Sequence, residues 1–104
     1  MASTITTFAG QTTANSQAVT IAGNSGAFSF QCVASALDAS DGTLTVEYSN
    51  DGTNFDTVPA LTDILASGAS DTHFNINAIN HAFYRVAWAA GSNTAGTIVV
   101  TTNL

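Results

Sequence analysis

Short segments in which apolar and polar residues alternate are the feature that most constrains the fold of this chain. Across residues 27–34, the apolar side chains Phe28, Phe30, Cys32 and Ala34 occupy every second position. Neighbouring side chains of a β-strand point to opposite faces, so this spacing predicts a strand with one buried face. Further strand-like runs lie at residues 19–21, 44–48, 74–76, 83–88 and 97–102.

Residues that favour turns separate these runs. Gly, Asn, Asp and Ser gather at residues 23–26, 38–42, 50–52, 66–70 and 91–94. They tolerate the backbone conformations that turns require. Short strands separated in this way at intervals of about eight to twelve residues are typical of sandwiches. We therefore predict an all-β fold, an antiparallel β-sandwich of about 7–8 short strands, with jelly-roll and immunoglobulin-like orders both open.

Two segments fit this pattern less clearly. The apolar residues of segment 59–65 have a spacing that suits a helical turn as well as a loop packed over the sandwich edge. Residues 1–15 are rich in Thr and Ala, with Ile5 and Phe8 as large apolar side chains. This segment suits either a first edge strand or an arm that becomes ordered on a partner.

The chain has the length and the apolar content of one folded domain, which we place at residues 1–104. It is 45% hydrophobic and 8% charged, too apolar and too weakly charged for a disordered chain. No apolar run is long enough to predict a membrane span. Residues 1–7 have neither the basic nor the apolar region of a secretory signal, so we expect the protein to be made and kept in a cytoplasm, or to be released from one by lysis.

The charge balance excludes two classes of partner. Seven acidic residues accompany a single basic residue, Arg85, and the formal net charge is −6. Nucleic acids and anionic membranes are bound by clusters of Lys and Arg, so neither is expected as a partner. The polar surface must come from Thr, Ser, Asn and Gln, which suits contact with another protein or with sugar.

Segment 46–55, VEYSNDGTNF, has the acidic and amide residues of a calcium loop. A calcium loop, however, needs oxygen ligands at several alternate positions and usually a closing bidentate carboxylate. Here Asp51 and Asp56 are separated by four residues and no glutamate follows. An Asp-Gly pair between alternating apolar runs is a strong hairpin signal, because the turn needs residues that tolerate positive φ. We therefore predict a hairpin turn, no metal site and no cofactor.

The residue types used in catalysis do not form a recognisable site. His73 and His81 lie eight positions apart, with Asn75, Asn77 and Asn80 nearby, and we interpret them as surface or hairpin-end histidines and not as ligands of a shared metal. Cys32 lies on an apolar face, where a free cysteine is usually a small core side chain. Neither a Gly-x-Ser-x-Gly elbow nor a lysine-containing phosphate loop occurs. We predict no catalytic residues, and hence no enzyme.

The strand predicted at residues 83–88 has two informative faces. Tyr84, Val86 and Trp88 share one face, which we interpret mainly as a core stripe. The alternative is a sugar-stacking platform, in which Trp88, Tyr84 or Phe55 would be exposed to solvent.

Arg85 lies on the other face of the same predicted strand. As the single cation of the chain, it is expected to pair with an acidic residue of its own chain or of a partner subunit. The candidates within the chain are Glu47, Asp56 and Asp71.

Residues 44–102 resemble a known class of protein. They contain a strand, a Ser-Asn-Asp-Gly-Thr-Asn-aromatic hairpin, an aromatic-Tyr-Arg-Val-x-Trp strand, and a closing Gly-Thr-Ile-Val-Val-Thr strand. This order resembles small virion structural proteins of tailed bacteriophages. The resemblance implies a β-sandwich that decorates or cements a capsid, or forms part of a fibre or tail, and it brings no catalytic residues. It also implies binding to a viral capsid protein lattice, and a place in the virion after assembly in the host cytoplasm.

The open edges of a sandwich suggest self-association, because this sequence does not guard them with lysine or with many charges. We predict a homo-oligomer, a trimer or larger, with Ile5, Phe8 and Arg85 as partner contacts. Two alternatives to the virion role remain open. One is a carbohydrate-binding module that uses the aromatic residues named above. The other is an extracellular filament or surface-layer subunit that polymerises by strand donation from its N-terminal segment.

Overall fold

The computed structural model describes residues 3–9, 17–22, 27–76 and 81–103, and for residues 3–9, 17–22 and 103 only the backbone. These residues contain eight strands and no helix, so the all-β prediction is confirmed. In chain order the strands are β1 (Ser3–Ala9), β2 (Gln17–Ala22), β3 (Phe28–Leu37), β4 (Gly42–Ser49), β5 (Asp56–Leu65), β6 (Gly68–Ile76), β7 (Phe83–Ala89) and β8 (Thr97–Asn103).

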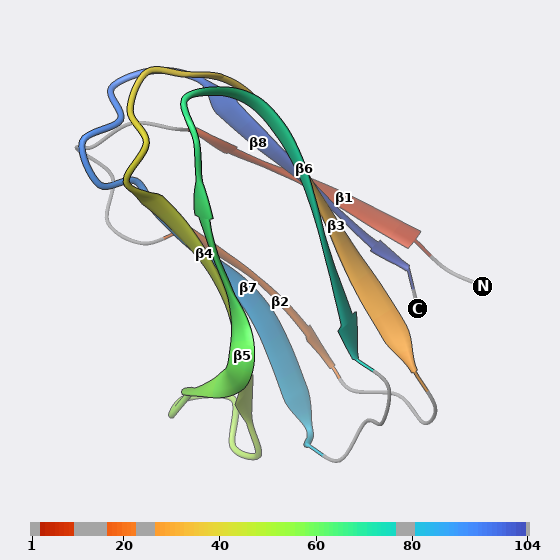
Figure 1. The fold of residues 1–104 in the computed structure, drawn as a ribbon. Coiled ribbons are helices and arrows are strands. Elements are labelled where there is room, and N and C mark those ends of the chain that lie inside the picture. Colours follow the sequence, from red (N-terminus) through yellow and green to blue (C-terminus); the bar gives the residue numbers. More distant parts are fainter. Residues whose placement is uncertain (1–2, 10–16, 23–26, 77–80, 104) are drawn as a thin grey trace.

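The strands form two antiparallel sheets that pack face to face (Figure 1). One sheet has the order β1-β8-β3-β6 and the other has the order β2-β7-β4-β5. The chain is thus wound as one long hairpin, in which β1 pairs with β8, β2 with β7, β3 with β6, and β4 with β5. This winding produces a jelly roll of two four-stranded sheets. The predicted sandwich is confirmed, and of the two predicted orders the immunoglobulin-like one is wrong.

The alternating residues of the sequence form the core between the sheets. In β3 the side chains of Phe30 and Cys32 are fully buried, and in β7 those of Val86 and Trp88 are also fully buried. Their neighbours along each strand face outward and are partly or fully exposed. Burial of each large apolar side chain stabilises the fold by about 1.5–3 kcal/mol, and this packing holds the two sheets together.

Trp88 occupies its place in the core because the first residue of β4 has no side chain. A Cβ atom on Gly42 would lie 2.0 Å from Cη2 and 2.7 Å from Cζ2 of the Trp88 ring. The glycine therefore opens the space that the indole fills.

One buried amide fixes the loops at this end of the sandwich. Asn93 is fully buried, and its Oδ1 accepts hydrogen bonds from the backbone N–H groups of Asp38 (3.1 Å) and Ala39 (2.9 Å). In the same region the Asp41 carboxylate accepts hydrogen bonds from the backbone N–H (2.9 Å) and the hydroxyl (2.7 Å) of Ser92. These bonds connect the loop before β4 with the loop before β8.

The stretch 59–65, left open between helical turn and loop, belongs to strand β5. Pro59 is tolerated there because β5 is an edge strand and because Pro59 lies between Thr57 and Thr62, where the pairing with β4 is irregular. Ala60 has a φ of 66°, and the pairing register of β5 with β4 shifts between Thr45 and Glu47. Pairing with β4 therefore determined that this segment is a strand, although its residue spacing alone suited a helical turn or a loop.

The predicted turn at residues 66–70 is shorter than expected, because β6 already begins at Gly68. Near the N-terminus, Ser3–Ala9 is an edge strand that pairs with β8 of its own chain, and residues 1–2 and 10–15 of the predicted arm lie outside the described residues. Ile5 is opposite Thr101 in the pairing, while its predicted role in a partner contact, like that of Phe8, stays a prediction. Among the described residues, no helix is long and apolar enough to cross a bilayer.

We expect Trp88→Ala to lower the free energy of unfolding by about 3–5 kcal/mol, because it leaves a large cavity between the sheets. Urea denaturation followed by circular dichroism measures this loss. Ile64→Ala is the control, since Ile64 is 66% exposed and its truncation should change stability by about 0.5 kcal/mol or less. Equal effects of the two substitutions would contradict the core position of Trp88.

Candidate binding face

The outward side chains of the β2-β7-β4-β5 sheet form the surface that we call the outer face. Along β4 and β7 these positions alternate with the buried core residues, and the register places the outward residues of β5 beside those of β4. Its described members include Thr43, Thr45, Glu47, Thr62, Ile64, Arg85 and Ala87. Apart from Glu47 and Arg85 these residues are uncharged, so the face is largely neutral.

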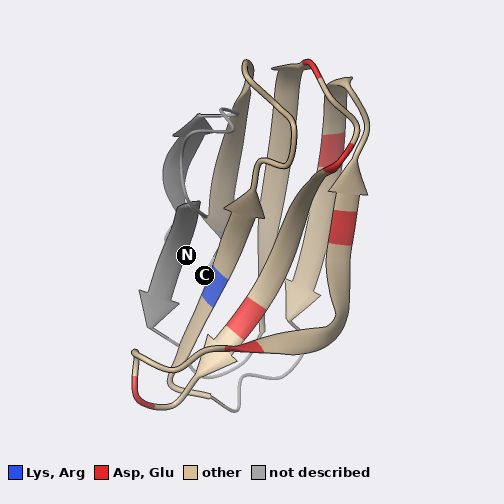
Figure 2. Cartoon of the chain, turned by 90° about the vertical axis from the view of Figure 1, so that its left-hand side faces the viewer, with Lys and Arg blue, Asp and Glu red and all other residues tan. Residues whose placement is uncertain are grey.

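The one charged pair of this face joins β4 to β7. Glu47 and Arg85 are direct cross-strand partners, and Arg85 Nε donates a hydrogen bond of 2.6 Å to Glu47 Oε1. Figure 2 shows the single basic position of the chain beside an acidic position on the neighbouring strand. The Arg85 side chain is 31% exposed and the Glu47 side chain is 20% exposed, so both are accessible from solvent. The predicted pairing of Arg85 is confirmed, with Glu47 as the partner among the three candidates.

Phe55 completes this cluster. Cζ of Arg85 lies 3.9 Å from the centroid of the Phe55 ring, which is a cation–π distance. The guanidinium is therefore held by the carboxylate and by the aromatic ring together. A guanidinium has five N–H donors in one plane, so the bond from Nε to Glu47 leaves further donors beside a carboxylate and an aromatic ring. We call Glu47, Phe55 and Arg85 the outer-face triad.

The hairpin after β4 sets the position of Phe55. The Asp51 carboxylate accepts hydrogen bonds from the backbone N–H groups of Thr53 and Asn54, each 2.8 Å long, and from the Asn54 amide at 2.7 Å. The Ser49 hydroxyl donates a further bond of 2.9 Å to the same carboxylate. These bonds, led by the backbone N–H of Asn54, hold the pKa of the Asp51 carboxyl well below its usual range.

The hairpin predicted for VEYSNDGTNF is confirmed, although its turn is wider than an Asp-Gly pair alone. β4 ends at Ser49 and β5 begins at Asp56. Gly52 has a φ of 76°, and a Cβ atom there would lie 3.1 Å from the Phe83 ring. Asp51 thus acts through its carboxylate, as a cap for the backbone of the turn. In the ranges that the structure describes, no three His, Cys, Asp or Glu side chains gather as metal ligands would.

The aromatic platform considered for sugar binding is wrong for two of its three residues. Trp88 is fully buried and Tyr84 is 2% exposed, so both belong to the core, as the main interpretation of their strand predicted. Phe55 is half-buried and lies at the surface beside Arg85. Of the three aromatic candidates, only Phe55 can contact a ligand on the outer face.

The remaining candidate residues lie apart from the triad. Cys32 is buried in the core, where burial above all, and the charges of Asp71 and Asp63, raise the pKa of its thiol to about 12. Such a thiol is a poor nucleophile. His73 lies on β6, whereas the His81 ring stacks on Tyr48 of the opposite sheet with ring centroids 3.9 Å apart. His73 is thus a strand residue of one sheet, whereas His81 precedes β7 and packs on a residue of the other sheet.

Comparison with known proteins informs the fold. No protein-family model matches the chain, and no curated protein matches it. A solved structure described as "CBM4 structure and function", a carbohydrate-binding module, is similar with a TM-score of 0.53 at 15% sequence identity. The likeness covers 82% of this chain and 56% of the other, so this chain spans just over half of that neighbour. The similarity supports the sandwich architecture.

We expect Asp51→Ala to lower the urea midpoint of unfolding, and to do so most at neutral pH. Folding lowers the pKa of this carboxyl, so its charged form stabilises the native state above about pH 4, and this contribution declines as the pH falls further. The midpoints of the two proteins should therefore converge between about pH 4 and pH 2.

The matched control for this titration is Asp56→Ala, which removes an exposed carboxylate just outside the turn and changes the net charge equally. A constant difference between Asp51→Ala and the natural protein across the whole range would contradict the capping role.

Proposed function

We propose that this domain is a non-catalytic binding module whose outer face holds a carbohydrate chain against the triad of Glu47, Phe55 and Arg85. The observation that carries the proposal is the Arg85 guanidinium, fixed between a carboxylate at 2.6 Å and an aromatic ring at 3.9 Å on an otherwise neutral sheet surface. A few fixed polar groups beside an aromatic surface are the usual make-up of a small-molecule site.

The chemistry of the triad suits a sugar. A sugar hydroxyl both donates and accepts hydrogen bonds, and the triad offers guanidinium donors next to carboxylate acceptors. The C–H faces of a sugar ring are apolar and can pack on the exposed part of Phe55. The hydroxyls of Thr43 and Thr45 lie on the same face of β4, which extends the polar surface along the strand. The net charge of −6 favours a neutral chain over an acidic one.

The fold supports the same class of ligand by analogy. The neighbour described as a CBM4 shares the sandwich architecture, and jelly rolls occur among both lectin domains and viral capsid proteins. Fold alone does not assign a function, so the proposal depends on the triad.

The virion role implied by the sequence resemblance is the second candidate function. It stays a prediction, and so do the capsid lattice partner, the virion location and the trimeric or larger assembly. The observation that favours it is positional. The resembling residues 44–102 span β4 to β8, and these strands with the β4–β5 hairpin carry the whole triad. A protein lattice bound at this face would contact the same three side chains.

The filament alternative has a structural cost. The segment that would be donated to another subunit, β1, pairs with β8 of its own chain from Ser3 to Ala9. Strand donation would require the release of that pairing in one subunit before it forms in the next.

We expect Phe55→Ala and Arg85→Lys each to weaken carbohydrate binding by about tenfold, the effect of roughly 1.4 kcal/mol. Arg85→Lys keeps the charge but loses the planar donor group that stacks on the ring. A glycan array identifies the ligand, and isothermal titration calorimetry of the natural protein and the variants measures its affinity.

The control variant is Val33→Ala, which truncates a 42% exposed residue on the outward side of the other sheet. Its affinity should equal that of the natural protein. Binding that survives both triad substitutions would refute the placement of the site. A blank array combined with specific binding to a phage capsid lattice would favour the second candidate.

A further inference from the structure

We propose that two copies of this chain associate through β6, which pairs with β6 of the second copy in antiparallel fashion about a two-fold axis at Thr72. This interface lies on the β1-β8-β3-β6 sheet and is separate from the proposed carbohydrate site. We infer that the partner strand comes from a second copy of the chain, because in one antiparallel register the acidic residue of each β6 strand lies opposite the basic residue of the other.

β6 is a free edge of regular geometry. It is the last strand of its sheet, and in the described part of the chain its one ladder partner is β3. The pairing with β3 runs without irregularity from Ser70 to Ile76. A regular edge strand presents a row of backbone N–H and C=O groups that can pair with another strand.

The neighbouring edge on the same side of the sandwich is less suited to pairing. β5 contains Pro59, which has no N–H to donate, and Ala60 with a φ of 66°. These features interrupt a regular ladder, as guarded edges do in other proteins. Of the two edges on this side, β6 is therefore the one open to a further strand.

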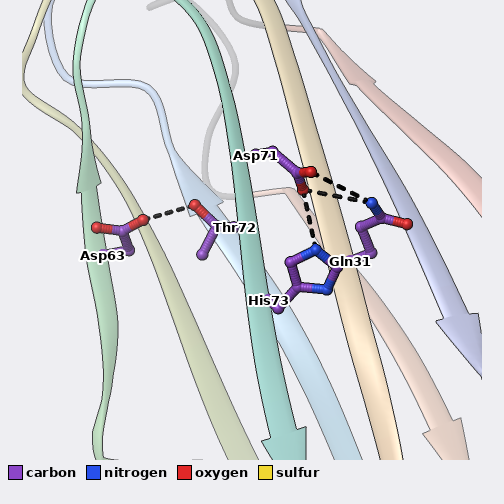
Figure 3. A network of polar contacts seen from close by, with 5 residues as sticks. All are labelled: Gln31, Asp63, Asp71, Thr72 and His73. Carbon is purple, nitrogen blue, oxygen red and sulfur yellow. Dashed lines mark hydrogen bonds and ion pairs between the residues drawn. The ribbon is translucent and has the colours of Figure 1, made fainter.

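The outward face of β6 carries one acidic and one titratable basic residue, two positions apart. Nε2 of His73 lies 3.4 Å from Asp71 Oδ1, and the two side chains are 56% and 53% exposed. Gln31 of β3 also donates to the Asp71 carboxylate, at 3.4 Å (Figure 3). On the inward side of β6, Thr72 donates a 2.6 Å bond to Asp63 of β5, so Asp63 is engaged between the sheets (Figure 3).

The spacing of these two residues selects the register. A two-fold axis at Thr72 places Asp71 of each copy directly opposite His73 of the other, which gives two symmetric cross-strand pairs. An axis one residue earlier would place Asp71 opposite Asp71, and like charges directly opposite are destabilising. An axis one residue later would place His73 opposite His73. Only the Thr72 register among these three therefore joins opposite charges.

Protonation of His73 should strengthen the pairing. Histidines generally gain their proton between about pH 8 and pH 5. The charged group nearest to His73 is Asp71 on its own strand. From β3 the neutral Gln31 lies beside this pair. Asp63 of β5 accepts a hydrogen bond from Thr72 on the inward side of β6 and so does not face His73. A protonated His73 would balance the charge of Asp71 along this edge, whereas a neutral His73 would leave the carboxylate of each copy uncompensated.

Sedimentation equilibrium of the purified protein up to about 1 mM, at constant ionic strength, tests this inference. A single added strand pairing buries less than about 1,000 Å², so the association is expected to be weak. We expect a monomer–dimer equilibrium whose Kd is about tenfold lower at pH 5.5 than at pH 8. His73→Gln should abolish this pH dependence.

A charge exchange tests the register. Asp71→His alone should weaken the dimer at pH 5.5, because the new side chain at position 71 of each copy would lie opposite His73 of the other copy, and two protonated rings repel each other. The double variant Asp71→His/His73→Asp should restore it, because each new pair again joins opposite charges. His81→Gln is the matched control, since it removes the other histidine, which stacks on Tyr48 of the other sheet, and the pH dependence should persist.

Three outcomes would overturn the inference: a monomer at all concentrations at pH 5.5, a closed trimer, or a dimer that His73→Gln leaves unchanged. Thermal unfolding of each variant shows whether a lost dimer is instead a lost fold. Since the outer-face triad lies on the other sheet, the triad variants Phe55→Ala and Arg85→Lys should dimerise normally, so failure of carbohydrate binding and failure of dimerisation are separate results.

Discussion

Burial of apolar side chains between two four-stranded sheets is the interaction on which the rest of this structure depends. Every strand whose side chains are described sends residues into that layer, from Phe30 in β3 to Trp88 in β7. The described hairpins and loops around the sheets are polar, and hydrogen bonds hold them both within one turn, as at Asp51, and between two loops, as from Ser92 to Asp41. With a formal charge of −6 and a single basic residue, the chain has few ion pairs to add, so the core must supply most of the stability.

The small number of basic residues also explains how the charges are arranged. The single cation is placed opposite Glu47 in the register and against an aromatic ring, so its contacts are local and defined. Several carboxylates instead accept backbone N–H groups in turns, as Asp51 does in the β4–β5 hairpin and Asp41 does beside Ser92. Asp51, which the sequence offered as a possible calcium ligand, is thus a cap for its turn.

The two proposals assign different functions to the two sheets. The β2-β7-β4-β5 sheet presents the neutral outer face with its triad, and the β1-β8-β3-β6 sheet presents the free edge at β6. A dimer joined through β6 would leave both outer faces accessible. Such a dimer could bind a repeating polymer or lattice at two points, and two linked weak contacts bind more tightly than either alone.

The sequence by itself determined the elements that depend on local chemistry. Alternating residues in β3, β4 and β7 predicted the strands and the core face, including the burial of Trp88, because side-chain direction in a strand has a fixed period of two. The Asp-Gly hairpin was also predictable, because turn residues have local conformational preferences. The opposite faces of Arg85 and Trp88 followed from the same alternation.

Tertiary structure decided everything that depends on which strands become neighbours. The jelly-roll order, the choice of Glu47 among three carboxylates, and the stacking of Arg85 on Phe55 all require pairing between residues about 30 or more positions apart, which no local pattern records. Residues 59–65 became an edge strand because β4 was available to pair with them. In the sequence Asn93 has no feature that distinguishes it from other loop residues. In the fold its side chain accepts hydrogen bonds from the backbone N–H groups of Asp38 and Ala39. A buried amide needs such partners, and here residues distant in the sequence supply them.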